Sequence, residues 1–110
     1  MEKWLCMIET NCIDDSRAKE FNEWYDRTHL PDILSTPGVV RATRYEDPNA
    51  AGGRGRYLAL YEIETDDVLQ TMAALGETMN RLAQEGRISG LVEILSGCFY
   101  RQITAPVEKS

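Results

Sequence analysis

The residues best suited to chemistry gather around His29, the only histidine of the chain. An imidazole exchanges protons near neutral pH, which makes His29 the first candidate for a general acid or base. Tyr25 lies four residues earlier and can share a helix face with it, while Asp26 and Asp32 lie within one turn. Because Pro31 disfavours helical backbone at the residue before it, a helix is expected to end or kink at the imidazole. The pattern predicts a proton-transfer group that faces a pocket, and not bulk water, beside a phenol and a carboxylate.

Other residues could bind a substrate near this group. Trp24 could stack on a flat ligand, and the strand residues Tyr57 and Tyr61 could line its pocket. Arg44 or Asn11 could bind a developing oxyanion. Each candidate also has an ordinary structural explanation: core aromatics, cross-strand pairs, turn residues, and a histidine that binds free carbonyl groups at a helix end.

The elements that must position these residues follow from hydrophobic periodicity. Alternating, β-branched or aromatic runs predict four strands, and apolar residues at spacings of three and four predict two helices. The strands are expected over Trp4–Cys12, Val39–Tyr45, Arg56–Glu64 and Leu91–Thr104, the last bent at Gly97. The first helix is expected to run from a cap at Asp14, Asp15 or Ser16 to His29 and Leu30, and the second over Thr65–Arg87. A short turn is expected over Asp32–Ser35 and a loop over Pro48–Gly55. This order predicts a ferredoxin-like βαββαβ subunit of the α+β class.

Both faces of the predicted sheet are apolar. In the first strand Trp4, Cys6 and Ile8 point to one side, while Leu5 and Met7 point to the other. Two helices can cover only one face. The second face is therefore expected to pack against a second subunit, giving a homodimer.

Composition narrows the class of protein. The chain has 110 residues, 43% of them hydrophobic and 27% charged, which predicts one domain over residues 1–104 followed by a polar tail over 105–110. A net charge of -6 with scattered lysines and arginines argues against nucleic acid or membrane partners. Three cysteines without CxxC spacing predict reduced thiols in a cytoplasmic protein, and no metal ligand set is expected.

The run FNEWYDRTHLPDILSTPGVVRATRYE over residues 21–46, followed by RYLALYEIE over residues 56–64, resembles the dimeric α/β-barrel superfamily. The pattern W-Y-x-x-x-H-x-P at a helix end, with P-G-V before the next strand, is closest to its EthD-like branch. The resemblance covers nearly the whole chain. It implies ferredoxin-like subunits whose sheets face each other in a dimeric barrel, with a pocket between each sheet and its own helices, and it places His29 at the histidine of that branch.

The resemblance implies a range of activities, since the superfamily includes lactone isomerases, polyketide cyclases, cofactor-free monooxygenases and haem-degrading enzymes. We expect a small cofactor-independent enzyme of catabolic or secondary metabolism that moves a proton on a hydrophobic carbonyl-containing or aromatic substrate, by isomerisation, cyclisation or elimination. His29 would be the general acid or base, and Tyr25 and Asp32 would orient it or donate to the substrate. The alternatives are a cofactor-free monooxygenase of a phenol and a non-catalytic ligand-binding or accessory protein. Metal, flavin and haem are not expected, because one histidine is the only recognisable ligand.

Overall fold

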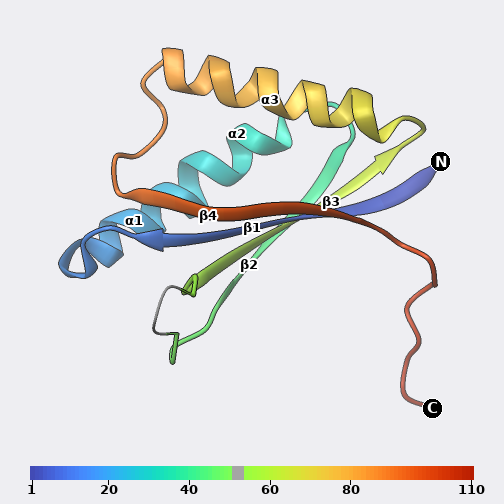
Figure 1. The fold of residues 1–110 in the computed structure, drawn as a ribbon, viewed down its shortest axis with the longest axis horizontal. Coiled ribbons are helices and arrows are strands. Elements are labelled where there is room, and N and C mark those ends of the chain that lie inside the picture. Colours follow the sequence, from blue (N-terminus) through green and yellow to red (C-terminus); the bar gives the residue numbers. More distant parts are fainter. Residues whose placement is uncertain (51–53) are drawn as a thin grey trace.

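The computed structural model describes residues 1–50 and 54–110. Within this part of the chain four strands form one antiparallel sheet, and the helices all lie on one side of it (Figure 1). The strands are β1 (Glu2–Cys12), β2 (Val39–Glu46), β3 (Tyr57–Thr65) and β4 (Val92–Arg101), in the spatial order β2-β3-β1-β4. This order and the two helical connections confirm the predicted ferredoxin-like α+β fold.

The first helical connection has an unexpected course. After a short 3-10 turn, η1 (Asp15–Arg17), it comprises α1 (Ala18–Trp24), a π-helical turn, η2 (Tyr25–His29), and α2 (Leu30–Leu34). Of the predicted end or kink at His29 and Leu30, the end is wrong, because helical backbone continues through both residues; the π-helical turn interrupts the regular α-helix there. The N–H of Leu30 donates to the carbonyl of Tyr25, five residues back. Pro31 lies in the first turn of α2, directly after the π-helical turn.

The second connection follows its sequence signals closely. Helix α3 (Val68–Gln84) starts at Asp67, whose carboxylate accepts hydrogen bonds from two N–H groups of the first turn. It ends before Gly86, which has a φ of +70°, and the following N–H of Arg87 donates to the carbonyl of Leu82. A buried hydrogen bond of 2.8 Å joins the hydroxyls of Thr78 in α3 and Thr36 after α2. The two helices are thereby fixed side by side over the sheet.

The hydrophobic core fills the space between the helices and the sheet. Phe21 of α1 and Leu82 of α3 are completely buried, and they face alternate strand residues such as Ala59 and Ile63 of β3. The opposite face of the sheet has no helix over it (Figure 1). There Tyr45 and Tyr100 are 56% and 58% exposed.

Strand β4 differs from expectation in the place of its irregularity and in its end. The strand register shifts opposite Glu9 and Thr10, which leaves Leu95 as the extra residue, so the irregularity lies at Leu95 and not at Gly97. Strand β4 ends at Arg101, and the exposed segment over residues 102–110 runs away from the sheet (Figure 1). The predicted loop Pro48–Gly55 includes residues 51–53, which lie outside the described residues.

Candidate active site

A cavity of about 280 Å³ lies between the sheet and its helices. Its walls come from the first helical connection, α3, the segment before β4, and strands β1, β3 and β4. Aliphatic, aromatic and sulfur-containing side chains form most of the lining. The polar groups among the lining residues are the Tyr25 and Tyr61 hydroxyls, the His29 imidazole and two groups of low polarity, the Trp24 indole and the Cys6 thiol. None of the described lining residues carries a formal charge at neutral pH, so the cavity suits an uncharged ligand.

The π-helical turn places His29 in the cavity wall between two aromatic rings. Trp24 stacks on the imidazole with ring centroids 4.8 Å apart, and Tyr25 meets it edge-on at 5.0 Å. Tyr25 is 2% exposed and His29 is 8% exposed. The predicted proximity of phenol and imidazole is therefore present. The imidazole lines the cavity and is shielded from bulk water, although the helix continues past it without the predicted end.

The electrostatic environment of His29 favours the neutral imidazole. Burial lowers the pKa of His29 to about 4, while the charge of Asp32 acts in the opposite direction and that of Arg44 lowers the pKa further. The Nδ1 atom of His29 is buried and has no hydrogen-bond partner among the described residues. At neutral pH the ring can therefore accept a proton, and it has no imidazolium proton to give.

The two tyrosines of the cavity wall can donate hydrogen bonds, whereas His29 can accept a proton. Burial raises the pKa of Tyr25 and also that of Tyr61. The neighbouring Tyr25 phenol raises the pKa of Tyr61 further. Both hydroxyls therefore stay protonated and can donate hydrogen bonds. The Tyr61 hydroxyl lies beside the Tyr25 phenol but forms no hydrogen bond of good geometry within the described part of the chain, and such a buried donor gains free energy when a ligand oxygen accepts from it.

Asp32 does not contact the imidazole. Its carboxylate forms a two-bond ion pair with Arg87, with distances of 2.7 Å and 3.1 Å from the guanidinium nitrogens. The carbonyl of Arg87 also accepts a 2.9 Å hydrogen bond from the indole N–H of Trp24. Asp32 thus acts on His29 only through its charge. Arg87 was missed from the sequence, because residues 32 and 87 are distant along the chain and neither has a local pattern that predicts the pair.

Arg44 lies behind the aromatic cluster and does not line the cavity. Its guanidinium sits 4.2 Å from the centroid of the Tyr25 ring, forms an ion pair of 2.7 Å with Asp26, and donates to the side-chain oxygen of Asn22 at 2.8 Å. A cation on an aromatic face stabilises that ring arrangement. The position supports the wall of the cavity from outside and leaves Arg44 without access to a bound ligand in this structure.

Asn11 and Tyr57 also lie away from the cavity. The side chain of Asn11 accepts a 2.8 Å hydrogen bond from the N–H of Arg56 and donates to the carbonyl of Arg54 at 3.4 Å, so it holds the start of β3. Tyr57 packs against Phe21 with centroids 5.2 Å apart. Of the predicted site residues, the structure brings Tyr25, His29, Trp24 and Tyr61 to the cavity and leaves Asp32, Arg44, Asn11 and Tyr57 outside it.

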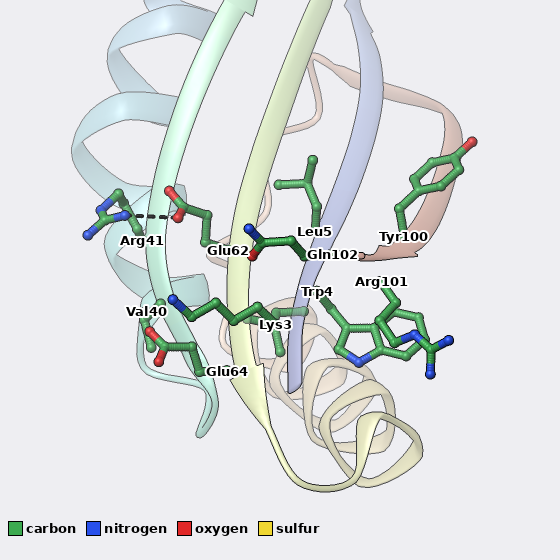
Figure 2. A pocket seen from close by; sticks show the side chains of 11 residues that line it. Lys3, Trp4, Leu5, Val40, Arg41, Glu62, Glu64, Tyr100, Arg101 and Gln102 are labelled. Atoms are coloured by element: carbon green, nitrogen blue, oxygen red, sulfur yellow. Dashed lines mark hydrogen bonds and ion pairs between the residues drawn. The ribbon is translucent and has the colours of Figure 1, made fainter. Parts of the chain in front are cut away.

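A second hollow of about 450 Å³ lies on the open face of the sheet (Figure 2). Charged side chains dominate it, among them Lys3, Arg41, Glu62 and Arg101, and an ion pair of 2.8 Å joins Arg41 to Glu62. These groups are already paired or well hydrated, and no histidine or cysteine lines the hollow. The cavity at His29 is therefore the better candidate for a reaction site.

Two classes of site have no support in the described residues. No group of three or more His, Cys, Asp and Glu side chains is placed to hold a metal ion in residues 1–50 and 54–110. Across the same ranges, no helix has both the length and the apolar character needed to cross a membrane.

The fold is shared with solved structures across almost the whole chain. No protein-family model and no curated protein matches the sequence. HapK from Hahella chejuensis has a TM-score of 0.70 at 18% identity, covering 97% of this chain and 99% of its own. SnoaB from Streptomyces nogalater, described as a cofactor-independent oxygenase, has a TM-score of 0.62 at 11% identity, covering 97% of both chains.

An ethyl tert-butyl ether d (EthD) family protein from Bacillus halodurans has a TM-score of 0.56 at 16% identity and covers 94% of this chain and 100% of its own. Two further matched structures are described as dimeric ferredoxin-like proteins. These identities are too low to transfer an activity, and the similarity concerns the fold. The structures that share the fold of this chain thus include dimeric ferredoxin-like proteins and an EthD family member, which confirms the resemblance seen in the sequence at the level of the fold.

Proposed function

We propose that this protein is a small enzyme that removes a proton from an uncharged, hydrophobic, carbonyl-containing or aromatic substrate, with neutral His29 as the base. One observation carries the proposal: an imidazole with a buried, unpartnered nitrogen lies in the wall of a cavity whose lining has no formal charge. An ionic substrate would lose its hydration there without gaining a counter-ion. A neutral substrate would lose little, and its carbonyl or phenol group could meet His29 and the tyrosines.

The proton transfer would proceed as a charge separation inside the cavity. The substrate C–H or O–H gives its proton to the imidazole, and the electron pair stays on the substrate as an enolate or phenolate. A protonated tyrosine, Tyr25 or Tyr61, would donate a hydrogen bond to the developing oxyanion. The imidazolium is stabilised by the oxyanion and by the charge of Asp32, which raises the pKa of His29. In a poorly hydrated cavity this attraction is stronger than in water.

The deprotonated substrate would then isomerise, cyclise or eliminate without a bound cofactor. A second candidate shares the same first step: an electron-rich phenolate passes electrons to O₂, as in a cofactor-free monooxygenase. The apolar lining favours this candidate because it can admit O₂ together with a flat substrate, and SnoaB, which has the same fold, is described as a cofactor-independent oxygenase. A protein that only binds its ligand in this cavity would show neither reaction.

The first test detects proton removal without knowledge of the final product. The protein is incubated with 2-tetralone in D₂O, and exchange of the C–H groups next to the carbonyl is followed by ¹H NMR. We expect exchange above the buffer rate and a decrease of about a hundredfold to ten-thousandfold in His29→Gln. Tyr100→Phe, a change on the open face of the sheet, serves as the control and should leave the rate unchanged. Equal rates in the native protein and His29→Gln would contradict the proposal.

Oxygen consumption separates the two reactions. An oxygen electrode should show no uptake with 2-tetralone if the enzyme only moves protons, whereas uptake with 1-naphthol that His29→Gln abolishes would favour the monooxygenase. Binding of both compounds with neither exchange nor uptake would instead indicate a binding protein.

A further inference from the structure

The mouth of the His29 cavity lies between α3 and β4. Two of the lining residues are exposed to solvent, Gly76 in α3 and Ile94 in β4, whereas the other described lining residues are buried or half-buried. Ile94 is 56% exposed although it also contributes to the cavity wall. These two residues on opposing elements mark the place where a ligand passes from solvent into the cavity.

Gly76 has no evident structural reason to be a glycine. Positive φ values among the described glycines occur at Gly38 and Gly86, not at Gly76. A Cβ atom built at Gly76 meets nothing within 4 Å, so no neighbouring atom requires the space. A glycine in the interior of a helix destabilises it relative to alanine, because the unfolded chain has more conformations to lose. The fold alone would therefore be more stable with alanine at this position.

We infer that Gly76 is a specificity-determining residue that keeps the mouth open and sets the largest substrate that can enter. The inference rests on the proposed function, because it assigns this opening to the same cavity. Met72 and Met79 lie four residues before and three residues after Gly76 and line the cavity with it. Their unbranched side chains adapt to a ligand. The opening at Gly76 is fixed by its backbone, and a side chain there would narrow the mouth for flat aromatic compounds of two or three rings.

Binding of three uncharged phenols of increasing size tests this role. The probes are phenol, 1-naphthol and 9-phenanthrol, and the readout is the shift of the His29 ring protons in ¹H NMR, which are assigned without ambiguity because the chain has one histidine. We expect Gly76→Ala to bind phenol within about twofold of the native protein and to bind 9-phenanthrol at least tenfold more weakly. In Gly76→Leu, 1-naphthol should be lost as well.

A matched control adds the same methyl group outside the cavity. Gly90 lacks a positive φ, a Cβ there also meets nothing within 4 Å, and the residue does not line the cavity. Gly90→Ala should bind all three phenols as the native protein does. The midpoint of thermal unfolding should be roughly 2 to 6 °C higher in Gly76→Ala than in the native protein, since alanine favours the helix. A lower midpoint would mean that Gly76 serves the packing of α3 and would overturn the inference.

The outcomes separate this inference from the proposed function. If 9-phenanthrol shifts the His29 resonances equally in the native protein, Gly76→Ala and Gly76→Leu, the cavity binds phenols and Gly76 does not control access. If none of the phenols shifts them in the native protein, the cavity does not take such ligands, and both the proposed function and the role of Gly76 are overturned.

Discussion

The two faces of the sheet use the same strands for opposite purposes. On the covered face, β1 and β3 contribute Cys6 and Tyr61 to a cavity without formal charges. On the open face, the alternate residues of the same strands are apolar near the centre, such as Met7 and Leu60, and charged at one end, where Arg41 pairs with Glu62 (Figure 2). One alternating strand pattern thus builds the candidate site on one side and, on the other, the face that is predicted to pack against a second subunit.

The difference shows that burial decides what a titratable group can do. The side chains of Arg41 and Glu62 are 68% and 45% exposed, so water screens their attraction and the pair contributes little to stability. His29 is 8% exposed, and its pKa is lowered from 6.5 to about 4, with burial as the main cause. A charge on the open face is therefore screened by water, whereas the protonation of the one histidine on the covered face is coupled to folding.

The largest effect is expected from a charge on the open face. Leu60→Asp should separate a homodimer into folded monomers, because each subunit would bury an unpaired carboxylate in the interface. Light scattering should give twice 12.5 kDa for the native protein and 12.5 kDa for the variant. Ala73→Asp, a charge on the exposed side of α3, should leave the dimer intact. A native protein that is monomeric at micromolar concentration would contradict the dimer, which the dimeric proteins of the same fold support.

A smaller effect concerns the covered face and the dependence of stability on pH. In the unfolded chain His29 has a pKa near 6.5, and in the folded protein burial lowers it to about 4. Between these pH values the unfolded state binds more protons than the folded state, so the free energy of unfolding should fall as the pH falls from 6.5 to 4. Below pH 4 His29 is protonated in both states, and it should cause no further decrease. The loss through this residue is about 3 kcal/mol. In His29→Gln this part of the pH dependence should be absent in urea unfolding.

The same titration can be read directly. The His29 ring protons should titrate with a midpoint near 4 in the native protein. Asp32→Asn should lower the midpoint further, because the charge of Asp32 raises the pKa. A midpoint near 6.5 would mean that the imidazole is hydrated and that the cavity does not shield it.

The fold was predictable because its signals are local. Strand alternation and the spacing of apolar residues at three and four each depend on a few neighbouring residues, and the structure confirms the strands and helices that they predict. The π-helical turn was not predictable, since the sequence does not specify that the N–H of Leu30 bonds to the carbonyl five residues back. The residues of this turn pack against the sheet and α3 through Tyr25 and His29, and such packing depends on distant parts of the chain.

The candidate site was predictable where residues share a helix face with His29, since helical spacing placed Tyr25 beside it. Tyr57 and Tyr61 were equal candidates on their strand, and of these two Tyr61 lines the cavity. The environment of Arg44 depended on Asp26, and that of Asp32 depended on Arg87, which lies on another element. Such pairs form only when distant segments meet. A sequence read alone shows the charge of these residues, and it does not show which partner neutralises that charge.

The smallest effect is expected at Tyr61, whose hydroxyl is buried without a partner in the described structure. Tyr61→Phe removes a polar group that forms no internal hydrogen bond, so the free energy of unfolding should change by no more than about 0.5 kcal/mol and should tend to rise. Binding should still respond: 2-tetralone, whose carbonyl can accept from this hydroxyl, should bind roughly twofold to tenfold more weakly, whereas naphthalene should bind as before. Tyr100→Phe makes the same chemical change on the open face, where the phenol is 58% exposed, and should alter neither ligand. If Tyr61→Phe lowered the free energy of unfolding by more than about 1 kcal/mol, the typical loss for a buried hydrogen bond, the hydroxyl would have a partner inside the protein. It would then not be free to bind the substrate oxygen.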